Sequence, residues 1–409
     1  MPASPSTARA INDRLALRLL QQEGPLTAGQ LKQLTGLSRP TVADLVERLS
    51  DAGLIGVVGE AGEQRRGPNA KVYGIVADRA HLAALDIRTE SVSVAVADLV
   101  GRVLAEASVP IDQDTGTGPA VEQAVALVER AVKEAGADRL HTVGIGAPGL
   151  IDPASGELRD SSGLPEWHRR LVAALQERLP ETRVSVENET NLAAVAEQRD
   201  GAARDRDTFV LLWLGHGTGA AVVLDGALRR GASGGTGEIG FLPVPGTAAL
   251  PTATDCEGGF HSLASAAAVV DLAARCAMPA AAGQGPAEVG VLRAAAGLVG
   301  AAVRKAPAVG DPTPAARFLD ALAGRLAVGV ASVVAILDPG CVVLGGEVGR
   351  AGGAELAARV RERIGRMTPL PTEVRATTLG GGAVLRGALL TARERAQEEL
   401  FTSPERPLP

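Results

Sequence analysis

The sequence LTAGQLKQLTGLSRPTVADLVERLS, residues 26–50, decides the fold of the N-terminal part of the chain. Thr27 and Gln30 have the spacing of a capping box, in which a hydroxyl and an amide bond to free backbone N–H groups at the start of a helix. Gly36 ends this short helix, and Ser38 caps the next one. Two short helices joined by a turn that contains glycine predict a helix-turn-helix.

The helices of this region carry apolar residues at the helical period. In the helix after Ser38 the spacing is i, i+3, i+4, i+7, and the residues are Val42, Leu45, Val46 and Leu49. An earlier helix is predicted over residues 11–22, with Ile11, Leu15 and Leu19 on one face and Ala16 and Leu20 beside them. Three helices of this kind are typical of a small DNA-binding domain.

The start of the second short helix presents polar side chains where a recognition helix reads the major groove. Ser38, Arg39 and Thr41 are the natural candidates for contact with base edges. Arg39 either makes a bidentate contact to guanine or holds a phosphate, and the sequence leaves both roles open. Lys32 and Arg48 are predicted to contact the DNA backbone. The predicted DNA-binding residues of the helices are Thr27, Lys32, Ser38, Arg39, Pro40, Thr41 and Arg48.

Two strand-like runs after these helices predict a β-hairpin wing. The runs are Leu54–Val58 and Lys71–Val76, and the polar loop between them contains Arg65, Arg66 and Gly67. Paired arginines before a Gly-Pro bend suit a wing that lies in or along the minor groove, so all three residues are predicted to bind DNA. A three-helix protein-docking module would show the same helical stripes, but it does not need the paired arginines.

From residue 79 onward, runs typical of strands alternate with runs typical of helices, which indicates α/β layers. The predicted strands are Leu82–Ile87, Val92–Ala97, Arg102–Val109, His141–Gly146, Arg183–Glu187 and Thr208–Leu214. The predicted helices are Val121–Ala135, 167–179, 190–201, 262–277, 315–336 and 382–399.

A series of short motifs in this part has the order and spacing of the ROK family (repressors, open reading frames and kinases). The motifs are Gly144-Ile145-Gly146-Ala147-Pro148-Gly149, Leu164-Pro165-Glu166-Trp167, Val186-Glu187-Asn188-Glu189, Gly215-His216-Gly217-Thr218-Gly219, Asp225-Gly226, Gly237-Glu238-Ile239-Gly240 and Val343-Leu344-Gly345-Gly346-Glu347. With the winged helix in front, the chain resembles ROK transcriptional regulators of the NagC/XylR type. The resemblance implies a two-lobed actin-like ATPase body, a sugar site in the cleft and, usually, dimers.

The predicted fold class is therefore α/β, with an N-terminal winged helix-turn-helix followed by a two-lobed actin-like ATPase (ROK) body. The expected parts are a disordered tail 1–10, a DNA-binding domain 11–78, a body 79–400 and a tail 401–409. Within the body, lobe 1 is expected over about 79–200 plus the C-terminal helix, and lobe 2 over about 201–381.

The first phosphate turn departs from the family pattern. Kinases of the family carry Asp-x-Gly-Gly-Thr there, whereas this chain has Asp86-Ile87-Arg88-Thr89-Glu90. Side chains at Arg88 and Thr89 obstruct the close approach of backbone amides to phosphate. Glu189 stands at the catalytic aspartate of an Asn-Asp pair, and a displacement of about 1 Å can lower a rate on the order of 10²-fold. We expect no ATP binding, no catalytic residue and no enzyme.

The sugar-contacting positions of the family are only partly kept. Asn188 and Glu238 match directly, whereas Gly163 and Phe241 replace an expected Asn and His, and the expected Glu falls near His261. Each net hydrogen bond contributes about 0.5–1.5 kcal/mol, so these changes weaken the case for an ordinary monosaccharide site. The candidate effector-binding residues are Gly149, Asn188, Glu189, Glu238 and His261.

The zinc site of the family is also altered. Its members commonly use a His and three Cys on a Cys-x-Cys-Gly-x-x-Gly-Cys loop, but residues 252–265 keep only Cys256, with His261 nearby. Structural zinc needs four good ligands. We therefore expect no metal and no cofactor.

Composition sets the remaining bounds. The chain has 409 residues and a net charge of −6, so nothing in the total charge points to nucleic acid. Three cysteines argue for a reducing cytoplasm, and the apolar run Leu326–Leu337 is too short to cross a membrane. Neither an export signal nor a membrane partner is expected.

These features predict a dimeric cytoplasmic transcriptional regulator, acting as a repressor, that binds a double-stranded DNA operator. Its body is expected to sense a sugar or sugar derivative. One alternative is a ligand-independent regulator whose cleft is vestigial. Another is a sugar kinase with an appended DNA-binding domain, which the altered phosphate turn disfavours.

Overall fold

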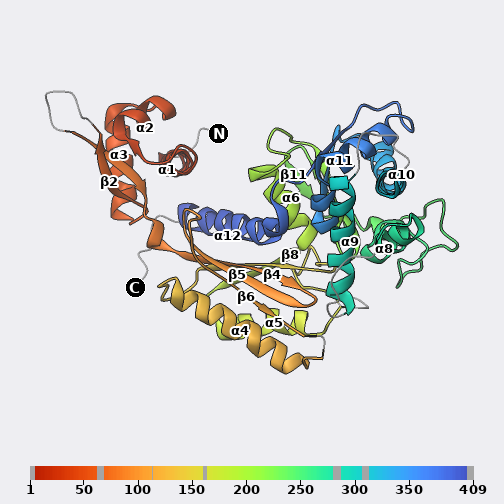
Figure 1. Cartoon of the computed structure of the whole chain (residues 1–409). Coiled ribbons are helices and arrows are strands. Elements are labelled where there is room, and N and C mark those ends of the chain that lie inside the picture. Colours follow the sequence, from red (N-terminus) through yellow and green to blue (C-terminus); the bar gives the residue numbers. More distant parts are fainter. Residues whose placement is uncertain are drawn as a thin grey trace.

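The computed structural model describes residues 5–61, 69–112, 114–159, 164–279, 287–305 and 313–402. It contains a small N-terminal domain and two lobes, each built on its own sheet (Figure 1). The predicted wing residues Arg65, Arg66 and Gly67 lie outside the described residues, as does Gly163.

The N-terminal domain is a winged helix-turn-helix. Its elements are α1 (Pro5–Gln22), β1 (Leu26–Thr27), α2 (Ala28–Thr35), α3 (Arg39–Asp51), β2 (Ile55–Ala61) and β3 (Ala70–Ile75). The strands form an antiparallel sheet in the order β1-β3-β2, so the hairpin β2–β3 is the wing. The predicted caps are present, because Thr27 and Gln30 form the capping box of α2 and Ser38 caps α3.

One expectation for the first helix is wrong, and the apolar face predicted for it is only partly buried. Helix α1 begins at Pro5, so the predicted tail 1–10 is partly helical. Its inward face carries Ala16 and Leu17, while Ile11 and Leu15 are 58% and 39% exposed. The helical period allows either face to point inward, and contacts with the other helices decide between them.

Lobe 1 is a five-stranded mixed sheet covered on both faces. Its strands, in the order β6-β5-β4-β7-β8, are β4 (His81–Arg88), β5 (Ser91–Asp98), β6 (Val103–Pro110), β7 (Thr142–Ala147) and β8 (Arg183–Asn188). Helices α4 (Thr117–Glu134) and α5 (Trp167–Arg178) pack on one face. Helices α6 (Glu189–Asp200) and α12 (Ala383–Thr402) pack on the other, as Figure 1 shows for α12. The 3-10 turn η1 (Ala77–Arg79) joins this lobe to the winged helix.

Lobe 2 has a second five-stranded sheet. Its strands, in the order β11-β10-β9-β12-β13, are β9 (Phe209–Leu214), β10 (Thr218–Leu224), β11 (Ala227–Arg229), β12 (Cys341–Gly345) and β13 (Glu373–Ala376). The helical elements are η2 (Ile239–Phe241), α7 (His261–Ala264), α8 (Ala266–Arg275), α9 (Ala287–Lys305), α10 (Pro314–Leu337), α11 (Gly346–Ile364) and η3 (Gly380–Gly382). The single helix predicted over 262–277 is broken at Ser265, which is extended and caps α8 through the N–H of Ala268.

Helix α10 is long and apolar enough to cross a membrane by composition alone. In the structure its inner face packs in the core of lobe 2 with residues of α8, α9 and α11. The buried side chains of that face include Phe318, Leu319, Leu322 and Leu326. Its apolar character is therefore accounted for by burial inside the protein.

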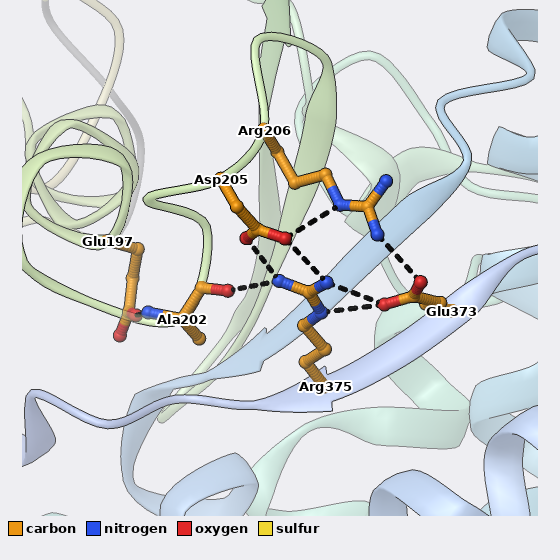
Figure 2. A network of polar contacts seen from close by, with 6 residues as sticks. All are labelled: Glu197, Ala202, Asp205, Arg206, Glu373 and Arg375. Atoms are coloured by element: carbon orange, nitrogen blue, oxygen red, sulfur yellow. Dashed lines mark hydrogen bonds and ion pairs between the residues drawn. The ribbon is translucent and has the colours of Figure 1, made fainter.

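The chain passes between the lobes twice, from α6 to β9 and from β13 to α12, and a polar network joins the two passages (Figure 2). Arg375 donates to Asp205 Oδ1 at 2.6 Å and to Glu373 Oε2 at 2.6 Å. Arg206 donates to Glu373 Oε1 at 2.6 Å. Glu197, buried at the end of α6, accepts from the N–H of Ala202 and from Thr377. These bonds tie the two passages to each other and to the end of α6.

Helix α12 connects the winged helix to lobe 1. Its last turn contains Phe401, which is 6% exposed, in one continuous core with Leu17 and Leu20 of α1. The predicted tail 401–409 is therefore too long by the two residues that complete α12. Because α12 also packs along lobe 1, the winged helix and lobe 1 share a core.

Candidate functional site

The N-terminus of α3 is the exposed tip of the helix-turn-helix. Ser38 has extended backbone angles and its Oγ accepts the N–H of Thr41 at 3.3 Å. The two hydroxyls also lie 2.8 Å apart, so Ser38 and Thr41 satisfy each other. Arg39, at the first helical position, is exposed, and so is Pro40. Of the predicted base-reading residues, Arg39 thus has the most accessible side chain.

Arg48 forms ion pairs within the domain. Its Nη2 lies 2.6 Å from Asp13 Oδ1 of α1, and its Nη1 pairs with Asp44. The hydrogen bond with buried Asp13 is the main cause that raises the pKa of Arg48, against the opposing effect of burial. In this structure Arg48 therefore links α1 and α3, and its contact with the DNA backbone stays a prediction.

The remaining residues of the reading surface lie on α2 and the wing. Thr27 and Gln30 use their side chains in the capping box, since Gln30 N–H donates to Thr27 Oγ1 at 3.2 Å and Thr27 N–H to Gln30 Oε1 at 2.9 Å. Lys32 is exposed in the last turn of α2. At the loop end of the wing, Asn69 Nδ2 donates to Glu60 Oε2 at 3.3 Å across the hairpin. Lys32 therefore joins Arg39 as a second exposed cation near the turn.

Asn188 lies at the junction of β8 and α6, on the lobe 1 side of the cleft. Its Oδ1 accepts the N–H groups of Thr190 and Asn191, which makes it the N-cap of α6. Its Nδ2 donates to the carbonyl of Gly149 at 3.1 Å. The structure thus brings together two predicted effector residues, but it uses the amide of Asn188 for contacts within the protein.

Glu189 follows directly and occupies the first turn of α6. Its Oε2 is enclosed and has no hydrogen-bond partner, although the residue as a whole keeps some exposure. Burial raises the pKa of Glu189 to about 8, and the nearby carboxyls of Glu238 and Asp86 act in the same direction. At neutral pH this carboxyl is mostly protonated, so it is poorly suited to accept a proton from a sugar hydroxyl.

Glu238 and His261 come from lobe 2. Glu238 stands at the residue before η2, where its side chain makes no capping hydrogen bond. The residue is exposed overall, yet desolvation by the surrounding protein raises the pKa of its carboxyl. His261 starts α7, and burial together with the neighbouring His216 lowers its pKa. A side chain at Gly217 would lie 3.8 Å from His261 Cε1, which places this ring against the Gly-rich turn before β10. Gly149, Asn188 and Glu189 therefore belong to lobe 1, and Glu238 and His261 belong to lobe 2.

Arg88 has a role that sequence reasoning missed. Its Nη1 reaches Glu347 of lobe 2 at 2.6 Å, and its Nε reaches Asp86 of its own strand at 3.0 Å. The adjoining cavity, with a volume of about 10 Å³, is lined by Trp213, Gly346, Glu347, Arg350, Gly380 and Gly381. About 10–15 Å³ is needed for one water molecule. Arg88 thus ties the phosphate turn of lobe 1 to lobe 2.

A second cross-lobe pair was also not predicted. Arg230, which follows β11 of lobe 2, places its Nε 2.6 Å from Glu187 Oε2 at the end of β8 in lobe 1. Glu187 also accepts from Asn191 Nδ2 at 2.9 Å. Glu187 and Glu347 both belong to the quoted motifs, which was the only sign in the sequence that they matter. Their partners, Arg230 and Arg88, are distant in the chain, so the pairs themselves could not be predicted.

Metal ligands do not gather at this site. Across the part of the chain that the structure describes, no group of three or more His, Cys, Asp or Glu side chains is placed to hold a metal ion. Cys256 is a free thiol, half-buried, and burial raises its pKa. A thiol of that kind is less ready to ionise, which a zinc ligand must do.

Comparison with known proteins agrees with both parts of the chain. Residues 82–395 match the ROK family and residues 11–67 match the MarR family. The DNA-binding transcriptional dual regulator NagC of Escherichia coli (strain K12) is 27% identical over 244 residues, which span 58% of this chain and 58% of NagC.

Two solved structures show the same architecture. A ROK family transcriptional regulator, a homologue of the E. coli MLC protein, has a TM-score of 0.74 at 22% identity and covers 97% of this chain and 98% of its own. A ROK family glucokinase from Streptomyces griseus, solved with glucose and AMPPNP, has a TM-score of 0.61 at 27% identity over 77% of this chain and 99% of its own. With a MarR-type winged helix in front of an actin-like kinase-fold body, and a family match over most of its length, this chain belongs to the ROK family.

Proposed function

We propose that this protein is a sequence-specific DNA-binding transcriptional regulator that acts as a repressor in the cytoplasm. The observation that carries the proposal is the exposed N-terminus of α3, with Arg39 at its first position, on a complete winged helix-turn-helix. The similarity to NagC, which is named as a DNA-binding regulator, supports it. Phosphate contacts from Lys32 and base or phosphate contacts from Arg39 would supply the first interactions.

A two-fold dimer would place two α3 helices in successive major grooves, about 34 Å apart. Such a dimer requires a palindromic operator of double-stranded DNA. The wing residues Arg65, Arg66 and Gly67 are proposed to contact the adjacent minor groove or backbone, as their sequence suggests. Replacing both arginines with alanine would then weaken binding to all sequences and reduce the salt dependence of binding by up to about two phosphate charges.

Selection of bound genomic fragments tests the proposal. We expect the purified full chain to enrich a small set of fragments that share an inverted repeat, and footprinting to show protection of both half-sites. Arg39→Ala should abolish the enrichment. Arg178→Ala, which removes an arginine of α5 that pairs with two glutamates of α4, should leave it intact. Enrichment without a common motif, or unaffected by Arg39→Ala, would contradict the proposal.

We also propose that the body has no kinase activity. Arg88 fills the phosphate turn, and the protonated Glu189 is a poor general base. The alternative, a sugar kinase with an appended DNA-binding domain, predicts ATP-dependent phosphorylation of a hexose. Assays with ATP and a panel of hexoses should show no turnover. Phosphorylation of any hexose at a turnover rate usual for kinases, about 1–100 s⁻¹, would overturn this part of the proposal.

The cleft between the lobes is proposed as the effector site, with a sugar or sugar derivative as the ligand class. Gly149, Asn188 and Glu189 face it from lobe 1, and Glu238 and His261 from lobe 2. A ligand bound to both lobes would change their relative orientation, and with it the spacing of the two DNA-reading domains in a dimer. A thermal-shift screen of sugars, amino sugars and sugar phosphates should find a ligand whose effect is lost in Glu238→Ala.

A ligand-independent regulator with a vestigial cleft is the second candidate. It is favoured by Asn188, whose amide is already bonded to Gly149, and by Arg88, whose guanidinium is already bonded to Glu347. This candidate predicts that Asn188→Ala and Glu238→Ala leave DNA binding unchanged in the presence of every compound that the screen contains.

A further inference from the structure

Arg88 stands where three parts of the molecule meet. It ends β4 of lobe 1, and its Nη1 donates to Glu347 Oε1 in the first turn of α11 at 2.6 Å. Its Nη2 donates to the carbonyl of Gly381 in η3 at 3.1 Å. Its Nε donates to Asp86 Oδ2 at 3.0 Å. One guanidinium therefore binds lobe 1, lobe 2 and the returning passage between them.

The charges around Arg88 hold it in this position. Asp86 is 5% exposed, Glu347 is 25% exposed, and Arg88 itself is 35% exposed. Burial works to lower the pKa of Arg88, but the two carboxylates outweigh it and the pKa is raised. Burial raises the pKa of Asp86, and Arg88 opposes that shift. Removal of Arg88 would leave a buried carboxylate without a cation, so the three side chains depend on one another.

A second ion pair joins the lobes, and in it the two lobes exchange the roles of cation and carboxylate. There lobe 2 supplies the arginine, Arg230, and lobe 1 the carboxylate, Glu187, at 2.6 Å. The glycine-rich loop after Arg230 also lies against lobe 1, since a side chain at Gly234 would come within 2.0 Å of the carbonyl of Ile151. Each lobe thus gives one arginine to a carboxylate of the other.

We propose that Arg88–Glu347 and Arg230–Glu187 form a two-point clamp that holds the lobes together without a bound nucleotide. In a nucleotide-binding protein of this shape, a ligand that contacts both lobes stabilises the closed arrangement. Here the guanidinium of Arg88, on lobe 1, makes the bridging contact itself by donating to Glu347 of lobe 2. The clamp fixes the angle between lobe 2 and the unit formed by lobe 1, α12 and the winged helix.

The arrangement of the hinge makes the clamp effective. The network of Arg375, Asp205, Arg206 and Glu373 ties the two passages between the lobes together (Figure 2). Motion about such a hinge opens or closes the cleft, and the two arginine pairs span that cleft. Opening therefore requires both pairs to break, whereas the hinge bonds stay intact.

Hydrogen exchange of the DNA-free full chain, followed by mass spectrometry, tests the clamp. Arg88→Ala should speed exchange in peptides that contain residues 86–91, 346–350 and 230–238 by about tenfold, because local opening becomes easier when a half-buried ion pair is lost. Arg88→Ala with Arg230→Ala should speed it further. Glu347→Gln should resemble Arg88→Ala, and combining these two changes should add little, because both remove one interaction.

The matched control is Arg178→Ala, which removes an arginine that also bridges two glutamates, Glu122 and Glu129, but within one lobe. It should leave exchange in the cleft peptides unchanged. Thermal unfolding of each variant shows whether it is folded, and Glu347→Gln, which keeps its size, carries the test if Arg88→Ala is unstable. Unchanged cleft exchange in folded Glu347→Gln, or equal effects of Arg178→Ala, would overturn the clamp.

Discussion

The DNA-reading tip and the interlobe cleft use their charged side chains in opposite ways. At the tip, Arg39 and Lys32 are exposed, while the capping groups of Ser38 and Thr27 hold the helices that present them. In the cleft, Arg88 and Arg230 are each paired with carboxylates inside the protein. Cations available to a partner mark the first region, and cations committed to the fold mark the second.

This difference explains why similar residue types support different conclusions. An exposed arginine at a helix N-terminus on a winged helix can pair with phosphate or guanine without breaking an internal bond. An arginine held between buried carboxylates must first leave them uncompensated. The following changes test the contrast, beginning with the largest expected effect.

Gly387→Ala should damage the body while leaving the reading surface untouched. A side chain at this position of α12 would lie 1.9 Å from the carbonyl of Leu192 in α6, so the two helices must separate. We expect a loss of about 3 kcal/mol in the free energy of unfolding, measured by urea denaturation. Gly382→Ala, where nothing lies within 4 Å of the added carbon, should have little effect. Equal stability of the two variants would show that α12 is not closely packed on lobe 1.

Arg39→Ala and Arg48→Ala should separate DNA contact from domain stability. Loss of Arg39 should weaken operator binding by about 2 kcal/mol and leave the melting temperature unchanged. Loss of Arg48 should lower the stability, because it leaves Asp13 buried without its partner. The two measurements are fluorescence anisotropy with operator DNA and thermal unfolding. If Arg48→Ala leaves the melting temperature unchanged and only weakens DNA binding, Arg48 contacts the DNA backbone, as the sequence predicts.

Glu189→Gln should change the pH dependence of stability. The folded-state pKa of about 8 is above that of an unfolded glutamate, so the folded state binds more protons and wild-type stability falls as pH rises from about 4.5 to 8. The Gln variant has no carboxyl to titrate at this position. The difference in the free energy of unfolding between the variant and the wild type should therefore shift in favour of the variant by about 1 kcal/mol per pH unit between pH 6 and 8. Urea denaturation at three pH values measures this, and parallel curves would show that Glu189 is ionised in the folded protein.

Ser38→Ala should have the smallest effect of the four. It removes the hydroxyl that accepts the N–H of Thr41, at a cost of about 1 kcal/mol in stability. Since the same change frees the start of α3, DNA binding should weaken as well. Ser38→Asp restores an N-cap acceptor and should recover the stability in thermal unfolding, but its negative charge near phosphate should not recover DNA binding.

Local sequence signals predicted the winged helix well. The capping box at Thr27 and the cap at Ser38 depend on residues three positions apart, so their geometry is fixed within a few residues. Of the apolar residues predicted on one face of α1, Ala16 and Leu20 are buried, whereas Ile11 and Leu15 are exposed, because the neighbouring helices cover only part of that stripe. The bond between Arg48 and Asp13 joins residues 35 positions apart, so no local pattern could indicate it.

The cleft shows the limit of such signals more clearly. The sequence indicated that Arg88 obstructs phosphate, but its partner Glu347 is 259 residues away and no local pattern links the two. His168 is 1% exposed and packs against Trp167, and burial lowers its pKa to about 4, which no local pattern indicates. The protonation of Glu189 likewise depends on enclosure by distant segments. Motif order identified the fold of the body, while contacts between lobes determine its chemistry.

The most direct test of the central claim is the affinity of the full chain for its selected fragment compared with the same fragment of scrambled sequence. Equilibrium anisotropy titrations at physiological salt, without ATP or sugar, give both constants. The proposed regulator should bind the selected fragment at least about 10³-fold more tightly than the scrambled one. Equal affinity for the two fragments would contradict sequence-specific recognition by the winged helix.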